Sequence, residues 1–330
     1  MLDPNPFELL RDLAGGYLLP RCLHVVADLG VADALGDTPL TAAELAPLVN
    51  ADRDSLHRVM RLLAGHGVFE MRNDCFGHTA ASRLLCSDHP QSMRAFARMM
   101  GLGFNWATLG KLDHTVRTGR PAGDEVMPGG IWAWIEGRPE ESAIFNGAMA
   151  GKAHGQVAGV LRSYDFSRFG VIGDIGGGRG HLLRGVLDAV PAARGLLFDL
   201  PHVIDEAATL ASSRATLVPG DFFKDALPVC DAYLAMEVIH DWADPEALAI
   251  LQAIRRAAPV DATLLLIEVI VPDEPGPDWA KTLDVLMLVL LGGRQRTVEE
   301  YRSLLDRADF SLARTIDTGA GISILEARPV

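Results

Sequence analysis

A glycine-rich segment in the second half of the chain has the residue types that could hold a nucleotide-type cofactor. An apolar run that begins at Val171 leads into Gly176, Gly178 and Gly180, and a helix is expected after them. Glycines lack a Cβ, so such a loop can turn sharply and bring its backbone N–H groups close to a ligand. The spacing excludes a dinucleotide fingerprint, because the third glycine of G-x-G-x-x-G would fall on His181.

Acidic residues follow three successive expected strands. Asp174 directly precedes the glycine loop, Asp199 ends the next apolar run, and Asp221 ends the third. In a doubly wound fold the second of these positions accepts from ribose hydroxyls, and Asp221 with Phe222 suits an adenine amine and its ring face. One such aspartate is more often a cap or turn residue, but three in register indicate a shared ligand. The acid before the loop resembles the first motif of S-adenosylmethionine (SAM) methyltransferases.

Four further motifs extend this resemblance over nearly the whole chain. They are D-L-P-H-V-I from Asp199, G-D-F-F from Gly220, H-D-W-A-D from His240 and G-G-R-Q-R-T from Gly292. In this order they resemble the small-molecule O-methyltransferases of the caffeate and acetylserotonin type. Bacterial members methylate hydroxyls of polyketide, phenazine, naphthoate or carotenoid intermediates in secondary metabolism, including antibiotic biosynthesis. The resemblance implies SAM as cofactor, S-adenosylhomocysteine as product and no metal. The cofactor residues that it implies are Asp174, Gly176, Gly178, Asp199, Leu200, Asp221 and Phe222.

Methyl transfer from SAM requires alignment of the acceptor oxygen and removal of its proton. Phenols ionise near pH ~10, whereas histidine, with a pKa near ~6.5, can accept a proton at neutral pH. His240 follows the expected strand 231–238 and precedes a helix in which Asp244 is the expected cap and Pro245 the first residue. This order predicts that His240 lies at the same edge of the sheet as the cofactor acids. A packed or turn histidine is the alternative.

Glu268 is the expected partner of this base. It follows the expected strand 263–267 and could accept from one imidazole nitrogen, so that the other nitrogen faces the acceptor. The resemblance implies the same pair and adds Asp241 beside the base, although turn bonding explains Asp241 equally well. Many plant relatives carry a second glutamate where this chain has Gln295. Glutamine can orient a ring but cannot stabilise imidazolium by charge, which puts strong base catalysis in doubt more than methyl transfer.

The N-terminal region predicts a separate domain. Residues 41–44 form a capping box, an amphipathic helix follows Asn50, and 68–71 with 75–78 indicate a hairpin, so the pattern is a helix-turn-helix with a wing. Alone, this pattern would suggest a DNA-binding regulator, but acidic residues interrupt the basic face that DNA requires. In the resembled family this region is a dimerisation domain. The apolar helices around 9–29 are long enough to wrap a partner subunit in a homodimer.

The segment between the two domains concentrates aromatic and thioether side chains, for most of which helix core is a sufficient explanation. The resemblance implies that several line a pocket for a flat aromatic acceptor. The implied pocket residues are Phe104, Trp106, Phe145, Asn146 and Met149, with Met287 and Leu291 on the opposite wall. Arg11 could meet a substrate carboxylate, although a solvated surface arginine is an equally simple explanation.

The length of 330 residues, with 49% hydrophobic content, is sufficient for a large core and two domains. We expect a winged-helix dimerisation domain over 1–98, a helical linker that contributes to the substrate pocket over 99–155, and a SAM-binding catalytic domain over 156–330. The fold class is α/β with a Rossmann-like, seven-stranded sheet that ends in an antiparallel hairpin of 310–316 and 322–326. An alternative keeps this fold and SAM but performs hydroxylation, decarboxylation or cyclisation, and the His240 and Glu268 pair favours methyl transfer over it.

Charge and cysteine usage exclude several other classes. The chain has 43 acidic residues against 30 Lys and Arg, a formal charge of −13, which argues against a nucleic-acid partner. Its four cysteines lack metal-ligand spacing, so we expect reduced thiols and a cytoplasmic protein without a metal. The apolar runs 264–271 and 283–291 are too short to span a bilayer, and no secretory signal pattern begins the chain, so neither membrane insertion nor secretion is expected.

Overall fold

The computed structural model describes residues 5–330, which form two compact units. The N-terminal unit comprises the described residues up to Trp106 together with 135–152, and the C-terminal unit comprises 107–134 together with 153–330. Within residues 5–330, none of the helices is both long enough and apolar enough to cross a bilayer.

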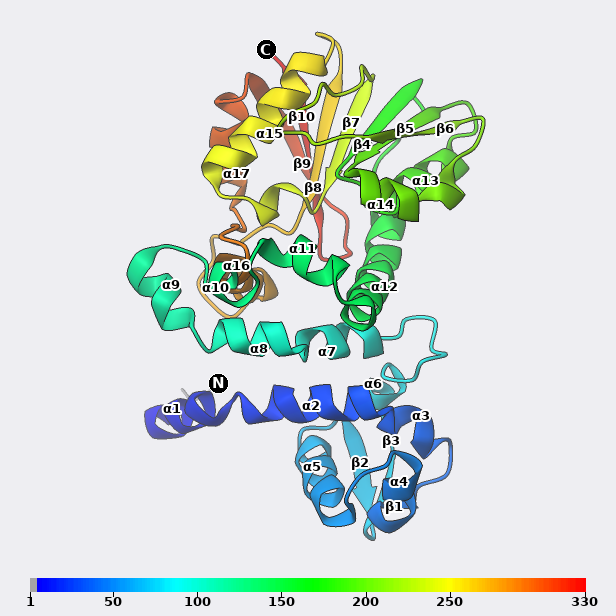
Figure 1. Cartoon of the computed structure of the whole chain (residues 1–330), viewed down its shortest axis with the longest axis vertical. Coiled ribbons are helices and arrows are strands. Elements are labelled where there is room, and N and C mark those ends of the chain that lie inside the picture. Colours follow the sequence, from blue (N-terminus) through cyan, green and yellow to red (C-terminus); the bar gives the residue numbers. More distant parts are fainter. Residues whose placement is uncertain (1–4) are drawn as a thin grey trace. The chain divides into compact units, whose positions relative to one another are not determined.

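The N-terminal unit contains short helices and a three-stranded sheet in the order β1-β3-β2 (Figure 1). The elements from the N-terminus to α8 are α1 (Pro6–Gly15), α2 (Leu18–Leu29), α3 (Val31–Leu35), β1 (Leu40–Thr41), α4 (Ala42–Leu48), α5 (Arg53–Gly65), β2 (Phe69–Arg72), β3 (Cys75–His78), α6 (Ala80–Arg83), α7 (Arg94–Met100) and α8 (Gly103–Leu109). One apolar core joins α2, α3, α4, α5 and the hairpin, and Leu45, Met60 and Phe76 are fully buried in it.

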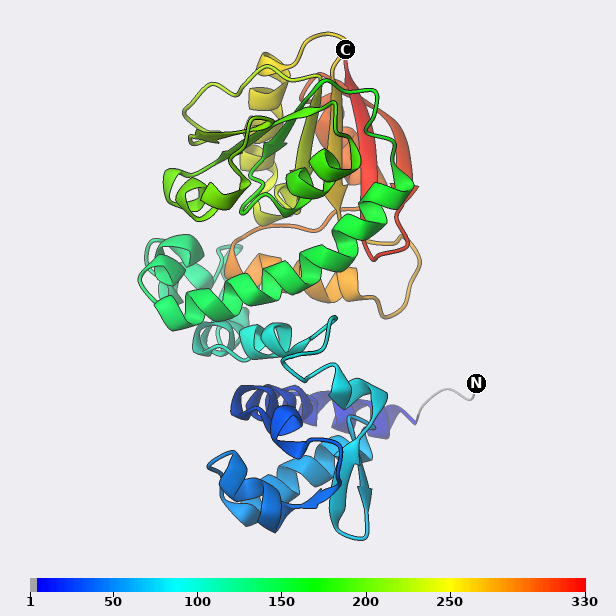
Figure 2. The same ribbon diagram turned by 90° about the vertical axis from the view of Figure 1, so that its right-hand side faces the viewer.

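Local sequence signals explain why these elements form where they do. Thr41 accepts a hydrogen bond from the backbone N–H of Glu44, while the Glu44 carboxylate accepts from that of Thr41, so the predicted capping box is present. Asn73 and Asp74 take positive φ angles of 49° and 64°, which lets β2 and β3 close the predicted hairpin in a tight turn. Figure 2 shows this hairpin beside α5.

The C-terminal unit is built on one large sheet with helices on both faces, and among the elements that follow α8 along the chain only residues 135–152 belong to the N-terminal unit. The remaining elements are α9 (Leu112–Thr118), α10 (Gly123–Val126), α11 (Gly130–Glu136), α12 (Pro139–Ser163), β4 (Val171–Ile175), α13 (His181–Ala189), β5 (Arg194–Asp199), α14 (Pro201–Glu206), η1 (Ala208–Leu210), β6 (Ala215–Pro219), β7 (Ala232–Met236), η2 (Ile239–Asp241), α15 (Asp244–Ala257), β8 (Thr263–Glu268), α16 (Trp279–Leu290), α17 (Val298–Asp306), β9 (Phe310–Asp317) and β10 (Ser323–Pro329).

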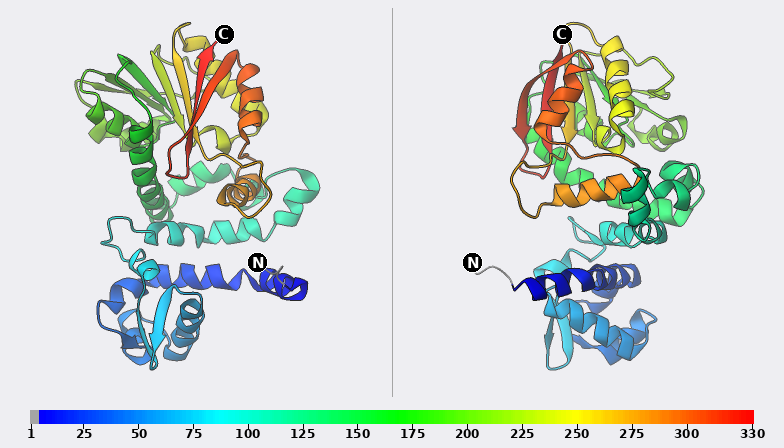
Figure 3. Two further views of the ribbon diagram at one scale, coloured as in Figure 1. Left: turned by 180° about the vertical axis from the view of Figure 1, so that it is seen from behind. Right: turned by 90° about the vertical axis from the view of Figure 1, so that its left-hand side faces the viewer.

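The seven strands have the order β6-β5-β4-β7-β8-β10-β9, which confirms the predicted α/β sheet. Strands β4 to β8 run parallel, and β10 pairs antiparallel with both β8 and β9. The closing hairpin is therefore present as predicted, and Figure 3 shows it at the edge of the sheet beside α17. The strand order reverses at β4, which has β5 on one side and β7 on the other. Ligands of open α/β sheets bind at such a switch point, outside the carboxyl ends of the strands.

Both faces of the sheet are covered, so the central strands are apolar throughout rather than alternating. In β8, Leu264 and Leu266 pack with α15 and α17 on one face, whereas Leu265 and Ile267 pack with α13 and the end of α12 on the other. This division follows the two-residue period of a strand. The scaffold holds the carboxyl ends of β4, β5, β7 and β8 in one row.

Candidate active site

The glycine loop connects β4 to α13 in a conformation that requires glycine. Gly176, Gly178 and Gly180 have φ angles of 67°, 59° and 72°, in the left-handed region. A Cβ on Gly180 would lie 2.4 Å from the Leu210 side chain, and one on Gly177 would lie 2.4 Å from a side-chain atom of β4. A Cβ on Gly178 would meet no described atom within 4 Å. The loop is therefore packed tightly on its protein side and open at Gly178, as a cofactor cradle must be.

Asp174 lies under this loop and is fully buried. Neither of its carboxylate oxygens has a hydrogen-bond partner among residues 5–330. Burial, and next the nearby carboxylate of Asp199, raise the pKa of Asp174 to about 7. A buried carboxyl group without a partner is costly, so this residue fits a cationic group such as the ammonium of a bound amino-acid moiety.

Asp199 ends β5 and faces the same loop. Its carboxylate accepts from the backbone N–H of Gly178 at 2.8 Å and from that of Leu200 at 2.7 Å. Burial raises the pKa of Asp199, although these two N–H groups oppose the shift. Each carboxylate oxygen has a second lone pair, so Asp199 can accept further hydrogen bonds from a ribose diol. Leu200 immediately precedes α14.

Asp221 and Phe222 follow β6. The Asp221 carboxylate lies 2.8 Å from the Lys224 ammonium, whose hydrogen bond lowers the pKa of Asp221, and it accepts from the backbone N–H of Phe223. The Phe222 ring makes edge contacts with Phe223 and Trp242, with centroids 4.8 and 5.9 Å apart. A Cβ built on Gly176 would lie 3.7 Å from Phe222. The aromatic ring thus borders the glycine loop, while the acid is already paired.

His240 lies on the short helix η2, after β7, and only 8% of its side chain is exposed. Its Nδ1 lies 3.2 Å from Oε2 of Glu268, the last residue of β8, and its Nε2 lies 3.3 Å from Oδ1 of Asp241. Glu268 is fully buried, and its other oxygen, Oε1, accepts from the backbone N–H of Ile239 at 2.9 Å. The structure therefore brings the three predicted catalytic residues together. Val238, two residues before His240, would lie 3.0 Å from a Cβ on Gly176, so this cluster and the glycine loop are neighbours.

Burial by itself lowers the pKa of His240, because it penalises the charged imidazolium. The carboxylates of Glu268 and Asp241 outweigh this effect and hold the pKa well above the ordinary value of 6.5. The two carboxylates therefore favour the protonated imidazolium over the neutral ring.

The loop after α16 completes the surroundings of the ring. Nε2 of the buried Gln295 lies 2.9 Å from Nδ1 of His240, in contact with the nitrogen that faces Glu268. Asp284 of α16 accepts from the backbone N–H of Gln295, and the backbone N–H of Arg294 donates to the His240 carbonyl at 2.8 Å. An amide NH2 and an Nδ1–H are both donors, so Gln295 can orient a ring that donates from Nδ1 only when its amide oxygen is turned toward that nitrogen.

Two sequence expectations around His240 differ from the structure. The preceding strand ends at Met236 rather than at Val238, because Glu237 takes a φ of 53° and leaves the extended conformation. Asp244 is not the cap of α15: Ala243 occupies that position, and Asp244 lies in the first turn. The Asp244 carboxylate instead pairs with the guanidinium of Arg296 at 2.7 Å. No spacing rule identified Arg296, whose role depends on contacts across about fifty residues of chain.

The residues implied to line the acceptor pocket are divided between the two units. Phe104, Trp106, Phe145, Asn146 and Met149 belong to the N-terminal unit, and Met287 and Leu291 to the C-terminal unit. Trp106 packs edge-on against His24, with ring centroids 6.0 Å apart, and the Arg21 guanidinium lies 5.5 Å from its centroid. Met287 and Leu291 belong to one small apolar cluster on and after α16. Arg11 is exposed on α1 and pairs with its neighbour Asp12.

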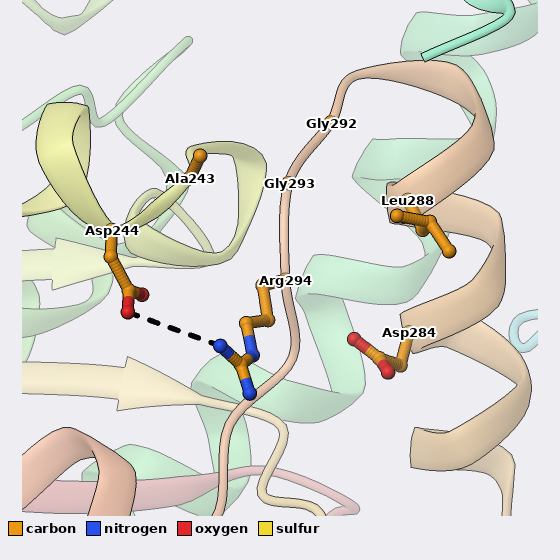
Figure 4. Close-up of a pocket in the computed structure, with 7 residues that line it drawn as sticks. All are labelled: Ala243, Asp244, Asp284, Leu288, Gly292, Gly293 and Arg294. Carbon is orange, nitrogen blue, oxygen red and sulfur yellow. Dashed lines mark ion pairs between the residues drawn. The ribbon is translucent and has the colours of Figure 1, made fainter. Parts of the chain in front are cut away.

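A cavity of about 370 Å³ lies beside the His240 segment in the C-terminal unit. Figure 4 shows Arg294 directed toward Asp244, with Asp284 and Leu288 of α16 on the opposite side. Its lining residues are Ala243, Asp244, Asp284, Leu288, Gly292, Gly293 and Arg294. None of the predicted site residues lines this cavity.

Comparison with known families places the whole chain in one group. Residues 109–311 match the O-methyltransferase domain, and residues 11–88 match the O-methyltransferase dimerisation domain. The chain is 38% identical to the phenazine O-methyltransferase PhzM of Lysobacter antibioticus, with 98% of this chain and 96% of that protein covered.

Solved structures agree with this placement. The mitomycin 7-O-methyltransferase MmcR superposes with a TM-score of 0.90 at 35% identity, covering 98% of this chain and 97% of that one. The O-methyltransferase NcsB1 from neocarzinostatin biosynthesis, solved with SAM and 2-hydroxy-5-methyl naphthoic acid, gives a TM-score of 0.81 at 30% identity, covering 95% and 96%. The chain therefore belongs to the SAM-dependent O-methyltransferases that carry an N-terminal dimerisation domain and methylate small molecules in secondary metabolism.

Proposed function

We propose that this enzyme methylates a phenolic hydroxyl of an aromatic or polyketide-type metabolite, with His240 as the general base. The observation that carries the proposal is the buried contact between His240 and Glu268 at the carboxyl ends of β7 and β8. When bound, SAM supplies a methyl group already activated on its sulfonium. The work left to the protein is to hold the acceptor oxygen in line and to take its proton.

The contacts of the ring support a division of roles. Glu268 holds Nδ1, so Nε2 is the nitrogen available to the acceptor. As the acceptor oxygen bonds to the methyl carbon, its proton passes to Nε2 of His240, and the bond between the methyl carbon and sulfur breaks. Asp241, 3.3 Å from Nε2, must yield this contact to the acceptor while its negative charge, with that of Glu268, stabilises the imidazolium. His240 must be neutral to act, so the rate should rise as pH passes its elevated pKa.

The cofactor and acceptor sites complete this proposal. Asp174 would pair with the amino group of SAM, and Asp199 would accept from its ribose hydroxyls. Phe222 would pack on the adenine ring, and Asp221, already paired with Lys224, would also accept from the adenine amine. Apart from Asn146, the implied pocket residues are apolar or aromatic, which suits a flat ring. Relatives act on a phenazine and on naphthoates, which supports the same class of acceptor here.

We also propose that the protein is a homodimer in which the domain over 1–98 forms the interface, with a linker over 99–155 and a catalytic domain over 156–330. The match of residues 11–88 to a dimerisation domain supports this arrangement. None of the residues of α1 is buried, although Phe7, Leu10 and Leu13 are apolar and at least two-thirds exposed.

Methyl transfer from labelled SAM to a panel of hydroxylated phenazines, naphthoates and simple phenols tests the proposed activity. With an acceptor that reacts, His240→Ala should lower kcat by ~10²–10⁴, typical of a general acid or base, while the affinity for S-adenosylhomocysteine stays nearly unchanged. Glu268→Gln should cost less, because an amide still orients the ring but cannot stabilise its charge. If His240→Ala turns over a weakly acidic hydroxyl at the wild-type rate at neutral pH, base catalysis is excluded.

A further inference from the structure

Arg296 is a charged side chain in the interior, only 1% exposed, in the loop between α16 and α17. Its Nε and Nη2 contact Oδ1 of Asp244 at 3.1 and 2.7 Å. The remaining donors go to backbone carbonyls: Nη1 donates to Ile239 at 3.2 Å and to Arg294 at 3.1 Å, and Nη2 donates to Trp242 at 3.0 Å. One buried guanidinium therefore donates five hydrogen bonds to two chain segments, residues 239–244 and the loop at Arg294.

These two segments are the ones that surround the catalytic ring. Ile239 and Trp242 lie on either side of His240, and Arg294 directly precedes Gln295, whose amide contacts Nδ1 of His240. The fork of a guanidinium can reach several acceptors in a plane at once, whereas an ammonium is a single point of charge. We propose that Arg296 is a positioning residue that fixes His240 against Glu268 by tying the η2 segment to the loop that carries Gln295.

The cost of burying this charge supports a specific role. Its carboxylate partner Asp244 has a side chain that is 42% exposed, while the other acceptors are neutral carbonyls. An apolar residue of similar volume often replaces a buried ion pair without loss of stability. The guanidinium carbon also lies 5.8 Å from the centroid of the buried Tyr301 ring, so an aromatic side chain borders the fork. The arrangement is suited to rigid support of the carbonyls at Ile239 and Trp242.

The titration of the His240 ring reports on this support without the need for an acceptor. The groups that face the ring are Glu268 of β8, Asp241 of η2 and Gln295 of the late loop. In full-length protein with labelled histidine rings, the His240 signal is the one absent from His240→Gln. We expect Arg296→Lys to shift this titration to lower pH, toward the ordinary value, because the ring no longer stays against Glu268.

Arg255→Lys is the matched control. Arg255 donates from Nε and Nη2 to the carbonyls of Asp309 and Val330, so it is also a fork on two backbone acceptors, but it does not contact the His240 segment. A general loss of stability would affect both variants, whereas the His240 titration should move only in Arg296→Lys. An unchanged titration in folded Arg296→Lys overturns the proposal. If Arg296→Lys does not fold, the His240 titration is measured in Asp244→Asn instead. A smaller shift to lower pH is expected there, and an unchanged titration again overturns the proposal.

This inference rests on the proposed role of His240, and the two can fail separately. If His240→Ala retains full turnover while Arg296→Lys still shifts the ring titration, the base assignment fails and the positioning role stands. If His240→Ala abolishes turnover but Arg296→Lys leaves the titration unchanged, only the positioning role fails. With an acceptor that reacts, Arg296→Lys should lower kcat by up to ~10²-fold, because a small misplacement at the reacting centre has an effect of this size. The affinity for S-adenosylhomocysteine should stay within about twofold of that of the wild type.

Discussion

Asp174 is the residue whose environment most clearly demands a ligand. The unfolded chain would ionise this carboxyl near its ordinary pKa of 3.8, whereas burial raises the value to about 7 in the folded protein. Between these two pH values the folded state therefore binds more protons than the unfolded state. The contribution of Asp174 to the free energy of unfolding falls as pH rises from about 4 toward 7. A positively charged group beside Asp174 would reverse this effect, because it favours the ionised form.

Binding of S-adenosylhomocysteine should consequently be linked to proton release. Below pH 7 the free Asp174 is mostly protonated, and an ammonium group beside it should expel that proton. Affinity should increase with pH up to about 7 and then level off. Calorimetry in two mildly acidic buffers of different ionisation enthalpy measures the released protons. Asp174→Asn should lose this linkage, and equal release in the variant and the wild type would contradict the assignment.

At the scale of elements, the sequence predicts what depends on neighbouring residues. The capping box at Thr41, the turn at Asn73 and the closing hairpin of the sheet follow from short patterns, and all three are present. The positive φ of Glu237 and the pairing of Asp244 with Arg296 depend on contacts between distant segments. No local pattern encodes them, so the strand end and the helix cap were predicted incorrectly.

In the candidate site, too, some features follow from local sequence and others depend on contacts between distant segments. The positions of His240 and Glu268 could be predicted, since His240 follows one apolar strand, Glu268 ends the next, and parallel strands bring their carboxyl ends together. The pairing of Asp221 with Lys224 and the support from Arg296 could not, because they depend on side-chain directions in loops. The residues proposed as catalytic could therefore be located from the sequence, but the contacts of Lys224 and Arg296 could not.

The glycine loop allows a test that separates folding from binding within one element. Gly178→Ala and Gly180→Ala both place a Cβ at positive φ, which costs about 1–2 kcal/mol. Gly180→Ala also forces a clash with Leu210 and should lose about 1–3 kcal/mol more in urea denaturation. Gly178 faces open space, so Gly178→Ala should be the milder change in stability but the one that weakens S-adenosylhomocysteine binding per folded molecule. The reverse ranking would show that the loop does not face the cofactor at Gly178.

For the whole molecule, the surface of α1 is the feature that a single chain does not explain. The helix is amphipathic, yet its apolar side remains exposed, with Phe7 at 76%, Leu10 at 67% and Leu13 at 69%. Contiguous exposed apolar groups of this kind mark interaction sites. A second copy of the chain is the expected partner, because the region from residue 11 matches a dimerisation domain.

Charges placed on this helix should therefore dissociate the protein. A closed homodimer presents the same patch from both subunits, so Leu10→Glu with Leu13→Glu buries two new charges per chain and should convert dimer into monomer. Light scattering coupled to size exclusion, over a range of concentrations, measures the change. Val260→Glu is the matched control, since Val260 is 85% exposed on the loop between α15 and β8, where a charge should leave the dimer intact. A wild-type protein that stays monomeric at all concentrations, or a double variant that stays dimeric, would show that α1 does not form the interface.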